Sequence, residues 1–246
     1  LRMSRGLGDV YKRQDVEQYR DGNYALSSAF PALMRKVFVW MTLALAITGI
    51  TAFGVASSPA LVAAIFGSKV LFWGLIIAEF GLVMAISGAI TRMSLSTATL
   101  LFVLYSVING ATLSVIFFAF SMAVIAKTFF ITAGTFGLMA LVGYTTKTDL
   151  TSMGKLLFMA LLGLIIATVV NLFVQSSGFD LIISYVGVLI FVGLTAYDTQ
   201  KIKQMCLEAP DGGEMSQKLA LLGALTLYLD FINLFLYLLR IFGRKE

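Results

Sequence analysis

Seven long stretches of this 246-residue chain are almost free of charged side chains, and this pattern limits the possible fold more than any other feature. A helix needs about 20 mostly apolar residues to cross the hydrocarbon core of a bilayer. The stretches run Val37–Ser68, Val70–Thr91, Met93–Ala126, Thr128–Thr146, Leu156–Phe179, Leu181–Tyr197 and Leu219–Leu239. Five contain no Asp, Glu, Lys or Arg, the second contains only Glu79, and the seventh only Asp230. Because the alternation of a membrane β-barrel is absent, we predict an all-α integral membrane protein with seven transmembrane helices.

The composition excludes other classes of protein. Hydrophobic residues make up 59% of the chain and charged residues 13%, whereas a soluble domain has about 25% charged residues. A soluble enzyme and a disordered chain are both excluded, since disorder requires low hydrophobicity. The net charge of +5 is spread over loops and tails without a basic patch among aromatic residues. We therefore expect the lipid bilayer, and no nucleic acid, as a partner.

The chain divides into a cytoplasmic tail, residues 1–30, and one transmembrane domain, residues 31–243. The first 14 residues, LRMSRGLGDVYKRQ, look like a translated adapter and are excluded from functional reasoning. Two of the stretches exceed one crossing, so we expect exposed turns at Ser57–Pro59 and near Ser121. The segment Gln200–Lys218 is expected to be a long solvated loop.

Basic residues beside the spans predict the orientation, because cytoplasmic loops carry an excess of Lys and Arg. With the amino terminus inside, the inner set is Arg35, Lys36, Arg92, Lys147, Lys155, Lys201, Lys203 and Lys218. The outer set is Lys69, Lys127, Arg240, Arg244 and Lys245. Eight residues against five predict a cytoplasmic amino terminus.

Proton chemistry in this chain must rely on carboxyl groups, because it has no histidine. Its one cysteine, Cys206, has no partner for a disulfide or a zinc site, and no cofactor is expected. Asp230 lies in the middle of the seventh stretch, where a charge requires a partner or a water-filled cavity. At helical spacing it shares a face with three polar residues that should support it, Thr226, Asn233 and Tyr237.

Two other acidic residues lie in or near the membrane. Asp198 follows the sixth stretch, with Thr195 one turn before it and Lys201 one turn after it, so an ion pair with Lys201 is an alternative to a functional role. Glu79 lies in the middle of the second stretch and Arg92 at its end. Thirteen residues separate them, which is roughly 20 Å along a helix, so either residue needs a partner on another helix.

Three membrane carboxylates are typical of a site for a hard cation such as calcium, or of a proton relay. Two that approach closely would form a pH sensor without histidine. Enzyme mechanisms find little support, because the chain has no HExxH motif and no histidine for a serine protease. An intramembrane aspartyl protease would need a GxGD motif, and Asp230 follows the residues TLYL instead. We expect the protein not to be an enzyme.

Three runs closely resemble the transmembrane Bax inhibitor motif family, in its bacterial branch. They are GYTTKTDLTSMG at Gly143–Gly154, GVLIFVGLTAYDTQKIK at Gly187–Lys203 and LYLDFINLFLYLLRIFG at Leu227–Gly243. The resemblance covers about residues 31–243. It implies a multi-pass protein of the inner membrane whose last helix is central, wrapped by the other six.

The resemblance also implies a function and a site. Members of the family are described as calcium-leak channels gated by pH, in which two aspartates share a proton. These aspartates fall on Asp198 and Asp230, which would also meet calcium. The family has an acidic residue in its second helix that interacts with an arginine, and the matching candidates are Glu79 and Arg92, in the ion pathway or as a latch.

The leading hypothesis is therefore a pH-sensitive calcium leak channel that Asp198 and Asp230 hold closed by sharing a proton. One alternative is a cation/proton antiporter that uses the same carboxylates. Another is a membrane regulator that binds other membrane proteins without transport. Small residues such as Gly134, Gly137, Gly193 and Gly223 could then serve helix contacts, although they more often serve internal packing.

Overall fold

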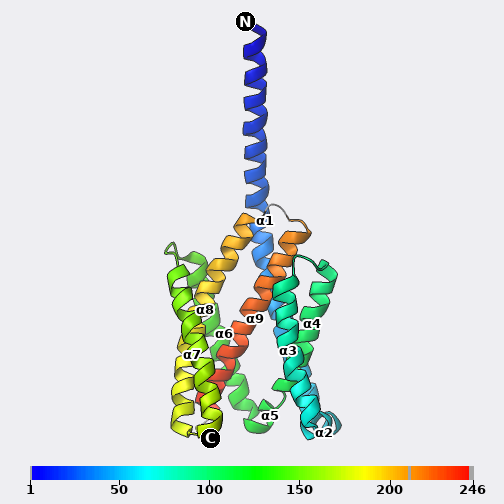
Figure 1. Ribbon diagram of the computed structural model, residues 1–246, viewed down its shortest axis with the longest axis vertical. Coiled ribbons are helices and arrows are strands. Elements are labelled where there is room, and N and C mark those ends of the chain that lie inside the picture. Colours follow the sequence, from blue (N-terminus) through cyan, green and yellow to red (C-terminus); the bar gives the residue numbers. More distant parts are fainter. Residues whose placement is uncertain (1, 210–211, 244–246) are drawn as a thin grey trace.

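The computed structural model of the protein describes residues 2–209 and 212–243, and side chains from residue 29 onward. Within these ranges every regular element is a helix, and Figure 1 shows them as one bundle with a long amino-terminal extension. The helices are α1 (Arg2–Ala56), α2 (Pro59–Gly67), α3 (Lys69–Ala89), α4 (Leu95–Leu113), α5 (Ile116–Ala119), α6 (Met122–Thr145), α7 (Thr151–Val174), α8 (Ser177–Glu208) and α9 (Glu214–Gly243).

Seven helical segments in the described residues are long and apolar enough to cross a membrane, which confirms the predicted number. They are Ala29–Ala56, Lys69–Ala89, Leu95–Ala119, Met122–Thr145, Thr151–Val174, Ser177–Glu208 and Glu214–Gly243. The chain also turns where it was expected to, between α1 and α2 and again just before α6.

Serine side chains begin several of these helices and explain where the turns fall. Each accepts a hydrogen bond from the backbone N–H three residues later, which satisfies a donor that the helix itself leaves unpaired. These residues are Ser58, Ser68, Ser94, Ser121 and Ser176. Lys127 therefore lies within α6, because Ser121 and not the next charged residue marks the start of that helix.

The prediction of a long solvated loop at Gln200–Lys218 is wrong. Helix α8 continues to Glu208 and α9 begins at Glu214. Charged residues mark where a helix leaves the lipid, but they do not end it, and Ile202 and Cys206 on this part of α8 are still buried. Residues 210 and 211 lie outside the described ranges.

The predicted tail is also helical. Helix α1 begins at Arg2 and passes into the first span without a break, and Figure 1 shows its amino-terminal half extending away from the bundle. Residue 1 lies outside the described part of the chain. The boundary near residue 30 therefore marks the entry into the bundle and not the start of a helix.

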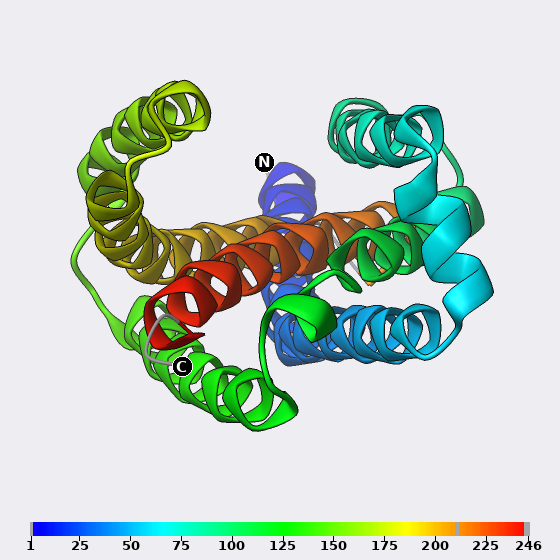
Figure 2. The same ribbon diagram turned by 90° about the horizontal axis from the view of Figure 1, so that it is seen from below.

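Helix α9 runs across the middle of the bundle as seen from below in Figure 2. It packs against α1, α4, α6 and α8, and 61% of the residues in its most apolar stretch of 18 are buried. In the corresponding stretches of α3 and α7 only 6% of the residues are buried. These two helices lie at opposite edges of the bundle, where α3 packs mainly against α4 and α7 against α8. Helices α1, α4, α6 and α8 thus make most of the contacts with α9, and a position of α9 at the centre of six helices stays a prediction.

Glycines allow the closest approaches of neighbouring helices to α8. A Cβ atom on Gly143 of α6 would overlap the backbone carbonyl of Ala196, and one on Gly154 of α7 would overlap the ring of Tyr197. Both glycines belong to the first of the three family-like runs. That run therefore fixes how α6 and α7 lie against the helix that carries Asp198.

The two ends of the bundle differ in charge. The end where α1 enters the bundle, called the basic end below, carries all eight residues of the predicted inner set. The opposite end carries Lys69, Lys127 and Arg240, while Arg244 and Lys245 lie outside the described residues. The predicted orientation, with the basic end in the cytoplasm, stays a prediction.

Candidate functional site

Two carboxyl groups meet inside the bundle, one from each of the two most buried spans. The side chains of Asp198 on α8 and Asp230 on α9 lie within hydrogen-bonding reach of each other. Asp230 is 16 residues from the start of α9, roughly 24 Å along that helix, and Asp198 is 10 residues before the end of α8, roughly 15 Å. The pair therefore lies more than two turns inside both helices, with Asp230 in the middle of its apolar stretch and Asp198 at the end of its own.

The surroundings of the two carboxyl groups differ. Asp230 is only 5% exposed, and its Oδ2 atom has no hydrogen-bond partner. Asp198 is half-buried beside a cavity. A buried polar atom without a partner is costly, and in a membrane span such a group usually has a function.

This cavity, called the aspartate cavity, has a volume of about 940 Å³ and lies among α7, α8 and α9, with Phe80 of α3 also in its lining. Both aspartates line it, and so does the polar stripe of α9 formed by Thr226, Asn233 and Tyr237. The helical spacing thus placed these residues on one face, and tertiary packing turned that face toward the cavity. The supporting role of their side chains stays a prediction.

Thr195, the remaining polar candidate, does not line this cavity. Its side chain is fully buried, and its hydroxyl donates to the backbone carbonyl of Phe191 at 2.7 Å. A threonine in a helix often satisfies its hydroxyl in this way. The structure therefore gives Thr195 a place in the helix packing beside Asp198.

Two lysines of the basic end, Lys155 and Lys201, also line the cavity. The ammonium group of Lys201 lies 5.9 Å from the ring centre of Tyr197. The ion pairs within the described ranges join Lys218 to Glu214 and Arg240 to Asp180. The alternative in which Asp198 only pairs with Lys201 is therefore not what the structure shows.

The segment between α6 and α7 is held against α8 next to Asp198. The Gln200 side chain accepts a hydrogen bond from the backbone of Leu150 and donates one to the carbonyl of Thr148, both at 2.8 Å. In the same segment Asp149 accepts two hydrogen bonds from Thr151, and these hold the pKa of Asp149 below its usual value.

Glu79 on α3 bonds to α4 and not to Arg92. Its carboxylate accepts a hydrogen bond from Thr112 at 2.6 Å and one from Asn109 at 3.3 Å. Arg92 is exposed in the turn after α3, and no ion pair in the described residues includes it. The predicted contact between Glu79 and Arg92 is absent, because the two lie at different depths along one helix.

A hydrogen-bonded network extends from Glu79 to α9 and α1. The amide oxygen of Asn109 accepts from the hydroxyl of Tyr228 at 2.8 Å, and that hydroxyl lies 2.7 Å from the hydroxyl of Thr48. The residues link α3, α4, α9 and α1. Sequence reasoning missed Thr48, Thr112 and Tyr228, because uncharged hydroxyl side chains are common in apolar spans and their partners lie on other helices.

Glu79 lines a second cavity, called the Glu79 cavity, with a volume of about 500 Å³. This cavity reaches residues near the end opposite the basic end, including Phe66 and Val115. It shares Phe80, Leu229 and Asn233 with the lining of the aspartate cavity. Only these side chains therefore lie on both cavities, at about the middle of the bundle.

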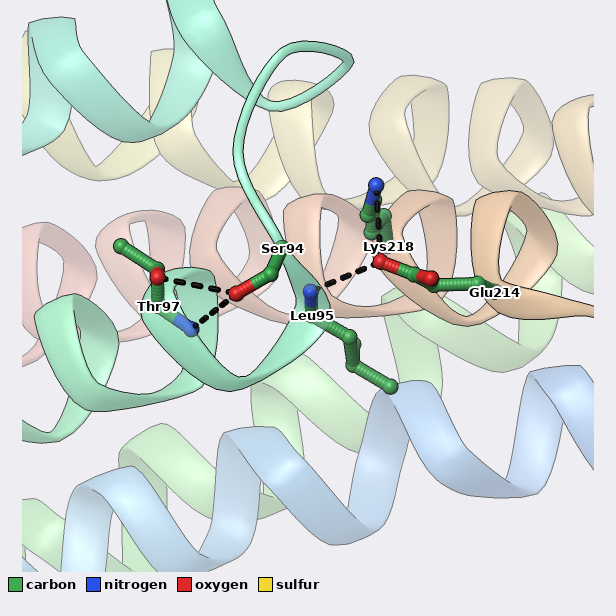
Figure 3. Close-up of polar contacts among 5 residues, drawn as sticks. All are labelled: Ser94, Leu95, Thr97, Glu214 and Lys218. Atoms are coloured by element: carbon green, nitrogen blue, oxygen red, sulfur yellow. Dashed lines mark hydrogen bonds and ion pairs between the residues drawn. The ribbon is translucent and has the colours of Figure 1, made fainter.

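At the basic end, Glu214 ties the start of α9 to the start of α4 (Figure 3). Its Oε1 atom accepts the backbone N–H of Leu95 at 3.0 Å and pairs with Lys218, also at 3.0 Å. An acidic group at a helix amino terminus is favourable because of the helix dipole. The contact holds the first turn of α9 against the start of α4.

The described residues hold no group of three or more His, Cys, Asp or Glu side chains that could bind a metal ion. The two aspartates alone supply fewer oxygen ligands than calcium takes in a closed site.

Comparison with known proteins decides the family. The sequence model of the family described as "Inhibitor of apoptosis-promoting Bax1" matches residues 31–246. The chain belongs to the Bax inhibitor family. Among its relatives in this family is the inner membrane protein YbhL of Escherichia coli strain K12, which is 49% identical over 87% of this chain and 92% of its own length. A protein of Borreliella burgdorferi is also 49% identical, over 87% of this chain and 92% of its own. RP147 of Rickettsia prowazekii is 43% identical over 87% of this chain and 89% of its own.

Proposed function

We propose that this protein is a pH-sensitive calcium leak channel of the inner membrane, in which Asp198 and Asp230 share a proton and hold the pathway closed. The observation that carries the proposal is the contact between these two carboxyl groups inside a membrane-embedded cavity. The name of the related YbhL supports the inner membrane, and the eight basic residues of the basic end support a cytoplasmic amino terminus.

The contact between the carboxyl groups requires a proton. Two unit negative charges 4 Å apart repel each other by about 4 kcal/mol at an effective dielectric constant of 20. A single proton removes this repulsion and forms a hydrogen bond between Asp198 and Asp230, as in other pairs of close carboxyl groups.

The direction of the pH response follows from this proton. At low pH the pair holds it, and α8 and α9 stay joined at Asp198 and Asp230. As the pH rises the proton leaves, the two charges repel, and the helices separate or their oxygens become ligands for a cation. Flux should therefore rise with pH, and the apparent pH midpoint belongs to the pair and not to either residue.

The two cavities supply a route for the ion. The aspartate cavity contains lysines of the basic end, and the Glu79 cavity reaches the opposite end. Phe80, Leu229 and Asn233 separate them. We propose that a cation passes from Glu79 to the aspartate pair when these side chains move, so the loss of Glu79 lowers the flux and leaves its pH dependence.

Calcium flux into liposomes that contain the purified protein tests the proposal, in steps from pH 5 to pH 8. We expect the flux of the wild type to rise with pH and the response to disappear in the double variant Asp198→Asn, Asp230→Asn. Asp180→Asn is the matched control, because Asp180 is also on α8 but pairs with Arg240 at the opposite end. Its pH response should equal that of the wild type.

Two results would contradict the channel. A double variant with the pH response of the wild type would show that the aspartate pair does not gate the pathway. Calcium flux that requires an imposed proton gradient would instead identify a cation/proton antiporter using the same carboxylates. If neither protein moves calcium under any of these conditions, transport is excluded and the non-transporting regulator is favoured.

A further inference from the structure

A third cavity, independent of the two carboxylate sites, opens between α1 and α6. It has a volume of about 640 Å³. Helices α1 and α6 lie on the same side of α9 in Figure 2, and Phe231 of α9 lines the cavity between them. We call this cavity the α1–α6 groove.

The walls of the groove are apolar, and those from α6 include small residues. Ala133, Gly137 and Ala140 lie one turn apart on α6 and leave space along that helix. A Cβ atom on Gly137 would meet nothing within 4 Å. Aromatic rings form much of the remaining wall, among them Phe38, Phe129, Phe136 and Phe231.

One end of the groove is cationic and polar, at the basic end of the bundle. Arg35 lines the groove there, is exposed, and forms none of the ion pairs of the described residues. Tyr144 lines the same end, stacked on Phe30 with ring centres 6.3 Å apart. The ammonium group of Lys203 lies 5.1 Å from the centre of the Tyr144 ring and donates to the Tyr144 carbonyl.

We propose that the α1–α6 groove binds one anionic phospholipid, with an acyl chain along the apolar walls and the phosphate beside Arg35. Charge complementarity supports this occupant, because a basic pocket between transmembrane helices suits an anionic headgroup. Arg35 lies near the start of its span and Tyr144 near the end of its own, so both lie at the depth of a headgroup. Arginine and a phenol hydroxyl both donate hydrogen bonds to phosphate oxygens.

The single cationic end of the groove favours a lipid over a helix of another protein. A transmembrane helix that packs on small residues requires no cation at the end of its interface. The groove instead joins an apolar channel to a single cationic end, which matches the two parts of a phospholipid. The chain of the lipid would lie against Phe231, the residue that follows Asp230.

Native mass spectrometry tests the proposal with protein taken from bilayers of equal parts phosphatidylglycerol and phosphatidylcholine. We expect wild-type protein to retain one phosphatidylglycerol in preference to phosphatidylcholine. Gly137→Leu fills the groove and should abolish this retention. Gly134→Leu is the matched control, since Gly134 lies on the same helix, has equal open space and does not line the groove.

Arg35→Gln tests the headgroup contact separately. It should lower the preference for phosphatidylglycerol over phosphatidylcholine about fivefold, which corresponds to about 1 kcal/mol for one basic residue at an anionic surface. The variants Gly137→Leu and Gly134→Leu of the first experiment should both fold, because leucine favours a helix more than glycine does.

Retention of phosphatidylglycerol by Gly137→Leu at the level of the control would overturn the proposal. An unchanged lipid preference in Arg35→Gln would overturn the assignment of the headgroup. A wild-type dimer that Gly137→Leu separates would show that the groove receives a second copy of this chain instead. None of these outcomes depends on whether the protein conducts calcium.

Discussion

Replacement of Tyr228 by phenylalanine should measure how strongly the polar network holds α1, α4 and α9 together. The Tyr228 side chain is fully buried, and its hydroxyl is the only part that the substitution removes. That hydroxyl lies between Asn109 on α4 and Thr48 on α1, at 2.8 and 2.7 Å. The variant therefore keeps the packing of the ring and loses only its polar contacts.

The size of the effect follows from counting protons. The two hydroxyl groups of Thr48 and Tyr228 supply one proton each, which makes two protons. They form three short contacts, each of which needs a proton to be a hydrogen bond: with each other, from Tyr228 to Asn109, and from Thr48 to the Ser106 carbonyl at 3.0 Å. Two hydrogen bonds can form at once, and Tyr228→Phe leaves one. Hydrogen bonds between membrane helices contribute about 0.6 kcal/mol on average. The buried oxygen of Asn109 also loses its donor, which costs about 1–3 kcal/mol. We expect a total loss of about 1.5–3.5 kcal/mol in the free energy of unfolding.

Unfolding of the purified protein by SDS in mixed micelles, followed by far-ultraviolet circular dichroism, gives this free energy. Tyr105→Phe is the matched control. Tyr105 is also buried on α4 and packs edge to face against Tyr228, but no hydrogen bond of the described residues involves its hydroxyl. Its loss should change the free energy of unfolding by less than about 0.5 kcal/mol.

Thr48, the other hydroxyl of this network, gives a second variant. Thr48→Val also leaves one of the two hydrogen bonds, and the double variant leaves none. The two effects should therefore add to within about 0.5 kcal/mol, although the hydroxyls of Thr48 and Tyr228 touch. A coupling energy above about 1 kcal/mol, or equal effects of Tyr228→Phe and Tyr105→Phe, would refute the proton count.

Two further predictions concern how the helices are held together. Gly143→Ala forces a methyl group against the carbonyl of Ala196, so it should lower the free energy of unfolding by more than about 2 kcal/mol, whereas Gly134→Ala has open space and should not lower it. The same SDS titration checks both variants. Glu214→Ala leaves Ser94 as the cap of α4 but removes the acceptor of the Leu95 N–H and the ion partner of Lys218, and it should cost about 1 kcal/mol. Hydrogen exchange should then speed up at the amide of Leu95, and unchanged exchange there would show that the contact with Glu214 carries no stability.

The sequence predicted the number of membrane-spanning helices better than the residues at which they end. Seven apolar stretches became seven spans, because hydrophobicity over about 20 residues decides whether a helix lies in lipid. It failed at Gln200–Lys218, where charged residues led to the prediction of a loop although the chain stays helical to Glu208. Charge reports the solvent around a residue, whereas hydrogen bonding along the backbone decides where a helix ends.

The candidate site shows the same division. Spacing along one helix placed Thr226, Asp230 and Asn233 on a common face, because that relation needs no knowledge of any other helix. The partner of Glu79 could not be found in this way, and Arg92 was wrong. Thr112 and Asn109 meet Glu79 only because α3 and α4 lie side by side in a particular rotation.

The sequence by itself thus determined the solvent, the number of spans and the polar face of the last helix, since each depends on residues close together in the chain. Only the tertiary structure decided that Asp198 meets Asp230, that a network joins Glu79 to Tyr228, and that α1 and α6 leave a groove between them. Those contacts depend on how helices cross and rotate against one another. In lipid this is set by close fits such as that of Gly143 and not by hydrophobicity, because the membrane is as apolar as the helices themselves.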